Sequence, residues 1–452
     1  MRNRTYGVVG GDGLYPVTYP IEGDPMSESF HEQLVKQRRY LHQFPEVGWT
    51  EFETTWYIVQ KVQSWGYCVH IGREVIDEKS IRGRNIELVN EARARAAAHG
   101  VPEEFLQKTA GLTGCVAEMV FEKEGPVLVF RFDIDALPVQ ETNAENHFPN
   151  REGFRSKREG IMHACGHDCH TSIGLTVARW IAEHKNELCG KIKIIFQPAE
   201  EGSRGARTVA ASGIIDDADF FFASHIGMQA KYGEVIIDPY GFLCGSKYDV
   251  TFIGRSAHLG ADPHKGRNAM AAACVATLQL LGIARHGDGM TRVNVGTFHA
   301  GRARNAIPDR ATIEVDIRGE TMAINDYMCE EAQNIFAGCA KSYSVGLEVI
   351  DQGTVCDLVN DRQSVDLLRR CAQKIPAIKT IFEKSDFGGS EDAAILARHV
   401  QSKGGLAAFF VVGADYLAGH HQPEFDVNEE ALDVGFQMYV NIVKEICEAS
   451  LT

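Results

Sequence analysis

Four short apolar runs in this sequence have the composition of buried β-strands, and ionisable side chains follow each of them. The runs occupy residues 127–132, 191–196, 220–223 and 407–412. Helix-like stretches such as 171–184 lie between them, and this alternation predicts an α/β sheet whose ligands gather beyond the carboxyl ends of its strands. The groups that follow the runs are Asp133 and Asp135, Glu200 and Glu201, His225, and His420 and His421. We therefore expect these groups to form a single site.

Residues 246–354 follow a different pattern, which predicts a second domain inserted into the first. Strand-like and helical stretches succeed one another there in the order β-α-β-β-α-β, which is typical of the ferredoxin-like fold. The first domain would be discontinuous, with residues 27–245 and 355–452, after an irregular N-terminal extension at 1–26. A length of 452 residues agrees with two domains. The highly charged segment 76–108 is interpreted as a surface insertion with a solvated helix.

The charge and the apolar runs argue against two classes of partner. The formal net charge is −15, whereas proteins that bind nucleic acids usually carry a basic face. No apolar run reaches the ~18 residues of a membrane-spanning helix, and the N-terminus lacks the pattern of a signal peptide. The 12 cysteines are scattered, so we expect reduced thiols and a cytoplasmic location.

The densest group of metal-binding side chains lies in residues 162–170, which contain two cysteines, three histidines and one aspartate. Borderline divalent metals favour thiolate and imidazole, with carboxylate completing the set. Cys165 and His167 offer two such ligands on one turn, where Gly166 lets the backbone fold closely. The alternative for this trio alone is a buried thiol beside a capping histidine. The remaining ligands would come from the strand ends, as Glu201, His225 and His421.

Five ligands exceed the four of one tetrahedral site, so two metal ions that share a bridging Cys165 thiolate are the economical interpretation. The adjacent carboxylates of Glu200 and Glu201 cannot easily bind the same atom, because they lie on one turn. One would bind metal while the other takes a proton from water. The alternative for a bare Glu-Glu pair is two solvated acids in a loop.

Three residues of the inserted domain are candidates for contacts with a substrate. His258 lies in a Gly-rich loop after a strand, where it could donate a hydrogen bond to an oxyanion formed by attack on an amide carbonyl. Asn305 and Arg318 could hold a substrate carboxylate, because the arginine fork matches a carboxylate bidentately. Taken alone, His258 and Arg318 would each more often be surface residues.

Seven motifs resemble, in their order, those of the M20 metallopeptidase family and in particular its amidohydrolase branch. They are Phe130–Pro138, Met162–His170, Phe196–Gly202, Ser256–His258, Arg304–Pro308, Gly389–Asp392 and His421–Asp426. The resemblance extends over residues 32–432, nearly the whole chain. It implies a catalytic α/β domain with a mixed sheet, interrupted by the ferredoxin-like α+β domain as a dimerisation or lid domain.

The resemblance also implies roles for individual residues. Glu200 matches the general base, and His258 matches a lid-domain histidine that steadies the tetrahedral intermediate, often in the active site of a partner subunit. Asp133, Asp135 and Asp168 would orient the metal ligands. The positions that match metal ligands are Cys165, His167, Glu201, His225 and His421.

The reaction implied by the resemblance is hydrolysis of the amide bond of an N-acyl amino acid with two divalent metal ions. The branch favours Mn²⁺, whereas the softness of thiolate and imidazole favours Zn²⁺ as the alternative. Residues 72–108 and 202–207 show a narrower likeness, to members of this branch that act on p-aminobenzoyl-glutamate. This likeness implies cleavage of p-aminobenzoyl-glutamate to p-aminobenzoate and glutamate. The alternatives are an indole-3-acetyl or other N-acyl amino acid as substrate, and a chain that is only the inactive partner of an enzyme. This likeness agrees equally with a homodimer and with a heterodimer of two related subunits.

Overall fold

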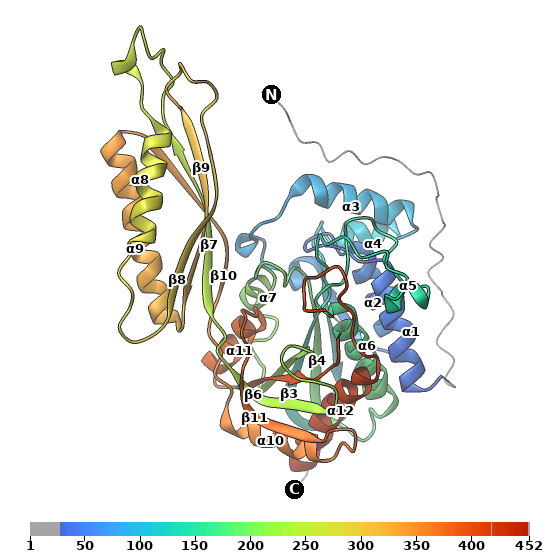
Figure 1. Cartoon of the computed structure of the whole chain (residues 1–452). Coiled ribbons are helices and arrows are strands. Elements are labelled where there is room, and N and C mark those ends of the chain that lie inside the picture. The colour runs from blue at the N-terminus through green and yellow to red at the C-terminus, as the bar shows by residue number, and fades with distance from the viewer. Residues whose placement is uncertain (1–27, 417, 451–452) are drawn as a thin grey trace.

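The computed structural model describes residues 28–416 and 418–450, and the predicted extension at 1–26 lies outside them. The described residues build two β-sheets, each with its own hydrophobic core (Figure 1). The larger sheet has eight strands in mixed directions, and the smaller sheet has four antiparallel strands. The predicted α/β fold class is confirmed.

The larger sheet presents the carboxyl ends of four neighbouring strands along one edge. In spatial order its strands are β1 (Cys68–Ile71), β2 (Cys115–Val120), β4 (Cys189–Gln197), β3 (Lys123–Asp133), β5 (Phe220–Ile226), β12 (Leu406–Val412), β6 (Glu234–Tyr240) and β11 (Thr380–Asp386). β4, β3, β5 and β12 are parallel to one another. The flanking strands β2 and β6 pair antiparallel with β4 and β12. The ends of the four parallel strands can therefore supply side chains to one place.

Helices cover both faces of this larger sheet (Figure 1). α6 (His167–Glu183) and α12 (Glu430–Ser450) pack on the central strands and on each other. α7 (Ala206–Ser212) packs against α11 (Ala393–Ser402), which contacts β5 and β12. The other helices of this lobe are α1 (Phe30–Gln43), α2 (Phe52–Ser64), η1 (Gly72–Glu74), η2 (Glu78–Ser80), α3 (Ile86–Ala98), α4 (Glu103–Lys108), α5 (Phe148–Arg151) and α10 (Arg362–Gln373).

Helix α1 begins at a reciprocal cap and ends beneath the start of α6. The Ser29 hydroxyl accepts the backbone N–H of Glu32 at 3.2 Å, and the Glu32 carboxylate accepts the backbone N–H of Ser29 at 3.0 Å. This capping box fixes the helix register, which places Arg38 and His42 on its buried face. Both side chains reach Asp168 in the first turn of α6.

The charged segment 76–108 forms a surface helix that is anchored along one side. Val89, Ala92 and Ala96 of α3 are buried. Arg95 of the same helix donates to the carboxylates of Glu46 at 2.6 Å and Glu53 at 2.8 Å. The other side of α3 is exposed, which agrees with the solvated helix expected from the charge pattern.

The smaller sheet has the strand order expected of a ferredoxin-like fold. In spatial order its strands are β10 (Gly346–Val355), β7 (Cys244–Ile253), β9 (Arg310–Gly319) and β8 (Thr291–Ala300). The short η3 (Pro263–Lys265) precedes α8 (Ala269–Leu281), which packs with α9 (Met322–Tyr343) on one face. In Figure 1 the strands lie between these two helices and the larger lobe. The exact domain boundaries and the dimerisation role stay predictions.

Candidate metal centre

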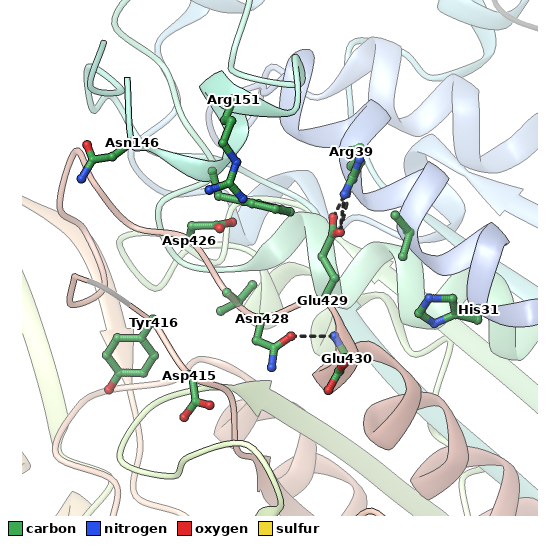
Figure 2. Close-up of a pocket in the computed structure, with 13 residues that line it drawn as sticks. His31, Arg39, Asn146, Arg151, Asp415, Tyr416, Asp426, Asn428, Glu429 and Glu430 are labelled. Atoms are coloured by element: carbon green, nitrogen blue, oxygen red, sulfur yellow. Dashed lines mark hydrogen bonds and ion pairs between the residues drawn. The ribbon is translucent and has the colours of Figure 1, made fainter. Parts of the chain in front are cut away.

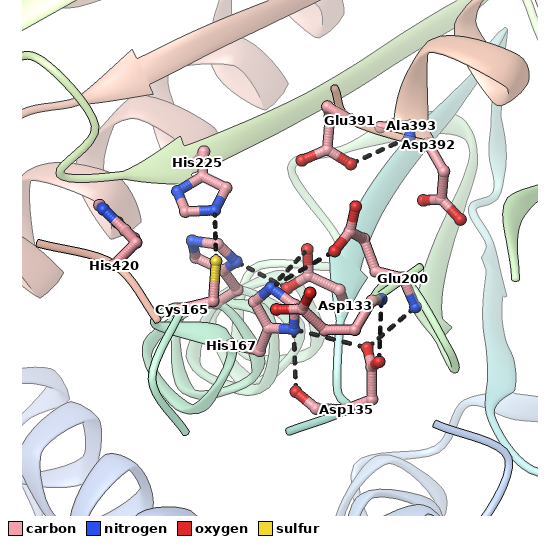
Figure 3. Close-up of polar contacts among 12 residues, drawn as sticks. Asp133, Asp135, Cys165, His167, Glu200, His225, Glu391, Asp392, Ala393 and His420 are labelled. Carbon is pink, nitrogen blue, oxygen red and sulfur yellow. Dashed lines mark hydrogen bonds and ion pairs between the residues drawn. The ribbon is translucent and has the colours of Figure 1, made fainter. Parts of the chain in front are cut away.

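The edge of the larger sheet gathers the ionisable groups that the sequence places after its strands (Figure 3). Asp133 is the last residue of β3, and His225 is the next-to-last residue of β5. Glu200 and Glu201 follow the end of β4, and His421 lies in the loop after β12. The expected convergence therefore occurs because these four strands are parallel neighbours.

A glycine turn at the start of α6 brings Cys165 and His167 to the same edge. Gly166 has a left-handed backbone with φ of 89°, which a side chain would strain. A Cβ atom at Gly166 would also lie 2.7 Å from Cγ2 of Ile226, at the end of β5. Only glycine allows this close approach, so the turn presses Cys165 against the strand that carries His225.

The five predicted ligands fall into two groups that share Cys165. The potential ligand atoms of Cys165, His167 and His225 all lie within 4.8 Å of one another, and so do those of Cys165, Glu201 and His421. Within these groups, Sγ of Cys165 is 3.4 Å from Nε2 of His225. Oε1 of Glu201 is 3.5 Å from Nε2 of His421. Two such groups with one shared thiol can accommodate two metal ions.

The hydrogen bonds of the histidines distinguish potential ligands from supporting residues. Nδ1 of His167 donates to the backbone carbonyl of Asp135 at 2.8 Å, and Nδ1 of His225 donates to that of Ile226 at 2.8 Å. In the neutral ring, each Nε2 atom then keeps a lone pair that can bind a metal. His170 differs, because its Nε2 accepts the backbone N–H of Ile226 and its Nδ1 donates to Asp133.

Buried atoms in these groups lack partners that a metal ion would supply. Within the described part of the chain, Nε2 of His167 and Oε1 of Glu201 are buried without a hydrogen-bond partner, which is costly for polar atoms. Burial raises the pKa of the Cys165 thiol well above its usual range, and Glu201 raises it further. A thiolate at this place therefore needs a nearby positive charge, which a divalent metal ion provides. The residues thus fit a metal centre.

Asp133 and Asp135 hold the ligand-bearing segments in place. The Asp135 carboxylate accepts the backbone N–H groups of Glu200 at 2.9 Å and Glu201 at 3.0 Å. The Asp133 carboxylate accepts from His170 at 2.6 Å and from Arg131 at 2.8 Å. Both aspartates are buried, so these bonds form in a region of low dielectric.

Asp168 anchors α6 to α1 from beneath the centre. Its carboxylate accepts from Nε of Arg38 at 3.0 Å and bonds to Nδ1 of His42 at 2.8 Å. All three side chains are buried. The contact is with the helix that carries His167, so Asp168 would act on the ligand only through the position of α6.

Glu200 lies beside the potential ligands with its carboxyl group buried at the cavity wall. Its Oε2 is 3.9 Å from Nε2 of His167. Burial raises the pKa of Glu200 well above its usual range, and the neighbouring carboxylate of Glu391 raises it further. A carboxyl group of this kind can both accept and return a proton.

A cavity of about 300 Å³ opens beside these groups, between the two sheets. The larger lobe lines it with Cys165, Glu200, Glu201, Gly202, Ser203, His225, Met228, Phe387, Gly389, Ser390, Glu391, His420 and His421. The smaller sheet contributes Lys247 from β7 and Arg318 from β9. Of the predicted carboxylate-binding residues, Arg318 therefore reaches the cavity.

The structure does not bring His258 and Asn305 into this cavity. His258 is exposed in the loop between β7 and α8, where its Nδ1 accepts the backbone N–H groups of Gly260 and Ala261. Asn305 is exposed between β8 and β9, and its backbone carbonyl accepts the backbone N–H of Leu259. The two residues are thus neighbours on the smaller lobe, outside the lining of the cavity in the same chain.

Backbone strain also concentrates around the cavity. Ala199, Ser203, Met228 and His421 all have positive φ, which non-glycine residues rarely adopt. Ala199 and Ser203 flank the two glutamates, and the N–H of His421 donates to the carbonyl of Ala164 at 2.7 Å. Such strained residues persist where the surroundings hold them, and they cluster at functional sites.

A larger hollow of about 630 Å³ lies elsewhere, between α1 and the loop before α12 (Figure 2). Basic and acidic side chains both line this hollow, and Arg39 pairs there with Glu429 at 2.7 Å. No residue predicted to bind metal or substrate lines it. We therefore assign the candidate site to the smaller cavity.

Two lining residues, Lys247 and Glu391, were missed by the sequence reasoning. Glu391 belongs to the motif Gly389–Asp392, so the sequence indicates that its position matters but gives no role for its side chain. Lys247 had no comparable signal, because a lysine on a half-exposed strand is ordinary.

The fold and the site together define a metallohydrolase-like α/β protein, and comparisons identify its family. The family model of peptidase family M20/M25/M40 matches residues 129–445. The chain is 46% identical to a protein of Haemophilus influenzae named as the homolog of one subunit of p-aminobenzoyl-glutamate hydrolase, over 92% of this chain and 98% of that protein. It is 39% identical to the indole-3-acetyl-aspartic acid hydrolase of Enterobacter agglomerans, over 91% and 96%. The chain belongs to peptidase family M20/M25/M40 and is a hydrolase.

Solved structures agree with this assignment. An aminobenzoyl-glutamate utilization protein from Klebsiella pneumoniae is similar with a TM-score of 0.79 and 35% identity, over 91% of this chain and 95% of that one. A dinuclear metal binding peptidase of family M20 from Bacillus subtilis is similar with a TM-score of 0.65 and 25% identity, over 93% and 99%. Among the described helices, none is both long and apolar enough to cross a membrane.

Proposed function

We propose that this chain is a dinuclear-metal amidohydrolase that cleaves p-aminobenzoyl-glutamate to p-aminobenzoate and glutamate. The observation that carries the proposal is the pair of ligand groups that share Cys165, next to Glu200. The choice of substrate rests on the 46% identity to a relative named for p-aminobenzoyl-glutamate. Indole-3-acetyl-aspartate is the second candidate, because the relative named for it is 39% identical over almost the same length.

In this proposal Cys165, His167 and His225 would hold one ion, and Cys165, Glu201 and His421 would hold the other. Two divalent ions, when bound, supply Lewis acidity toward the amide carbonyl and lower the pKa of water. Mn²⁺ is the proposed metal, and Zn²⁺ is the alternative that thiolate and imidazole favour. Nε2 of His167 and Oε1 of Glu201, which are buried without a hydrogen-bond partner among the described residues, support this ligand set.

Glu200 would be the general base and acid of the reaction. Its carboxylate takes a proton from the attacking water and then returns that proton to the leaving amine. The raised pKa of Glu200, which burial and Glu391 cause, suits the return of the proton. Arg318, at the cavity wall, would hold the free carboxylate of the amino acid.

His258 and Asn305 would act on the cavity of a partner chain. Both are exposed on the smaller lobe and lie outside the cavity of their own chain. We propose that residues 246–354 form a dimerisation and lid domain, and that a second chain brings its own His258 to steady the oxyanion. The partner would be a second copy or a related chain, since the Haemophilus influenzae relative is named as the homolog of one subunit of a hydrolase.

A cytoplasmic location is part of the same proposal. The 12 cysteines are all free, including those in the interior. Free thiols at this number are typical of a reducing compartment.

Glutamate release from p-aminobenzoyl-glutamate tests this function. The purified chain is stripped with a chelator, reloaded with Mn²⁺ or Zn²⁺, and measured alone and with any related chain from the same genome. We expect turnover only after reloading, and faster turnover with Mn²⁺. Indole-3-acetyl-aspartate is measured in parallel. No hydrolysis of either amide by metal-loaded protein, with or without a partner, would overturn the proposal.

A further inference from the structure

One wall of the cavity carries positive charge, and the site residues discussed above use only part of it. Lys247 and Arg318 project from the smaller sheet into the cavity, whereas the opposite wall carries Glu200, Glu201 and Glu391. A substrate with its amide at the ligand groups would direct its anionic end toward the cations. In an N-acyl amino acid this end is the amino acid, because the amino acid carries the free carboxylate.

The two cations are neighbours on one face of the smaller sheet. Lys247 of β7 lies directly opposite Asp316 of β9, and Arg318 is two residues further along β9. Lys247 and Arg318 are thus diagonal neighbours, with backbones about 7–8 Å apart. Long side chains at this spacing can reach two separate anionic groups of one small molecule.

Among the described residues, only one of the two cations already has a partner. Arg318 donates to both oxygens of Asp316, at 3.1 and 3.0 Å. For the ammonium group of Lys247 the described residues provide no ion pair or hydrogen bond. A half-buried ammonium group without a carboxylate partner is available for an anion of the ligand.

A small recess continues from the cavity at the same place. It has a volume of about 30 Å³, more than the roughly 10–15 Å³ that a single water molecule needs by this measure. The charged and hydroxyl side chains that line it are Ser203, Lys247, Asp316, Arg318 and Ser390. The recess is therefore large enough for one small polar group. Two cations and two hydroxyl groups border it, against one carboxylate, that of Asp316, which pairs with Arg318. A carboxylate fits this chemistry.

We propose that Lys247 is a specificity-determining residue that binds the side-chain carboxylate of the released amino acid, while Arg318 binds its α-carboxylate. The enzyme would then select amides of dicarboxylic amino acids. This inference rests on the proposed amidohydrolase function but not on the acyl group. The names of both relatives above contain an acidic amino acid, glutamate in one and aspartic acid in the other.

The test compares two amides that differ in side-chain charge alone, p-aminobenzoyl-glutamate and p-aminobenzoyl-glutamine. The metal-loaded protein should prefer the glutamate amide in kcat/KM. Lys247→Met keeps the aliphatic stem and should lower kcat/KM for the glutamate amide by roughly 10- to 100-fold, the usual range for a hydrogen bond to a charged group. The glutamine amide should change by far less, and Lys247→Arg should restore much of the preference.

Two further variants separate a specificity role from a structural one. Lys247→Glu should shift the preference toward p-aminobenzoyl-ornithine, whose side chain is cationic, and a merely structural lysine would not cause this reversal. Lys341→Met, on the exposed surface of α9, is the matched control and should leave the ratio of the two substrates unchanged.

The outcomes distinguish the two proposals. No hydrolysis of any amide by the metal-loaded, unmodified protein overturns the amidohydrolase function. Hydrolysis without a preference for the glutamate amide, or an equal loss on both amides in Lys247→Met, overturns the role of Lys247 and leaves the function intact.

Discussion

The two sheets of this molecule carry their charged side chains in opposite ways. At the edge of the larger sheet, Arg131 contacts Asp133 and Asp392 at 2.8 Å and Glu391 at 3.0 Å, and the arginine side chain is 0% exposed. On the smaller sheet, Arg318 contacts Asp316 at 3.0 Å, with side chains 36% and 35% exposed. The arginine–carboxylate contact thus lies in the interior in the larger sheet and at a solvated wall in the smaller sheet.

This difference separates two tasks. Buried charges are expensive to leave unpaired, so the network around Arg131 holds the ligand-bearing loops in a fixed arrangement. Half-exposed charges are screened by water and contribute little to stability. Their side chains remain free to contact a ligand, so different residues at these positions can select different ligands. We therefore expect substitutions in the larger sheet to affect catalysis and folding, and substitutions in the smaller sheet to affect mainly substrate selection.

The largest expected effect is on turnover, in Glu200→Gln. Glutamine keeps the size of the side chain but cannot accept the proton of water, so kcat should fall by ~10²-fold or more. The metal content should stay at the level of the unmodified protein, as measured by elemental analysis. Glu145→Gln, at an exposed position, is the control. Near-normal turnover in Glu200→Gln would refute the assignment of the base.

The next expected effect is on kcat, in His258→Ala. This substitution lies in the smaller lobe, but the reaction takes place at the edge of the larger sheet. A lost oxyanion donor typically costs about 10²- to 10³-fold in kcat. We expect such a loss with unchanged metal content, although His258 lies outside the cavity of its own chain. Measured loss of metal would instead make His258 a ligand, and unchanged kcat would remove it from the reaction.

The convergence of the metal ligands could be predicted from the sequence because it depends on strand order along the chain. Three apolar runs indicate buried strands, and they are followed by Asp133, Glu201 and His225. Parallel neighbouring strands place their carboxyl ends together. Gly166 could be interpreted in the same way, because a tight turn between two ligands requires it. These features are local or depend on simple topology.

Other features of the site could not be predicted, because they depend on contacts between distant segments. The sequence cluster 162–170 offers three histidines, and only the hydrogen bonds of His170 to Asp133 and Ile226 show that its ring nitrogens are both engaged. The cationic wall of the cavity depends on Lys247 of β7 facing the larger lobe. The sequence does not indicate this, because lysine is common on half-exposed strands. β11 was also missed, because its residues Thr380–Asp386 are mostly polar and exposed.

The comparison of the two arginines can be tested directly by unfolding. Arg131→Met leaves the buried carboxylates of Asp133, Glu391 and Asp392 without their cation, so the free energy of unfolding should fall by about 3–5 kcal/mol. Arg318→Met should change it by less than about 1 kcal/mol, because its pair with Asp316 is half exposed. Denaturant titration of both variants measures the difference. Equal losses would contradict the distinction between the two sheets.

The last expected effect is a dependence of stability on pH that comes from His42, and it is smaller than the loss expected for Arg131→Met. Burial alone would lower the pKa of His42, but its bonds to Asp168 at 2.8 Å and Glu141 at 3.2 Å outweigh this and raise the pKa to about 9. A histidine in the unfolded chain has a pKa of about 6.5. The folded state therefore binds this proton more tightly, and the stabilisation is fully present below about pH 6.5.

As the pH rises from about 6.5 through about 9, the stabilisation from His42 should be lost, by up to roughly 3 kcal/mol. His42→Gln should remove this part of the pH dependence, so the difference in unfolding free energy between the two proteins should shrink over the same range. His286→Gln, on the smaller lobe, is the matched control, since its partner Asp288 is 91% exposed. A difference that stays constant from about pH 6 to about pH 9 in His42→Gln, measured at a fixed metal concentration, would show that the buried pair with Asp168 does not hold the proton.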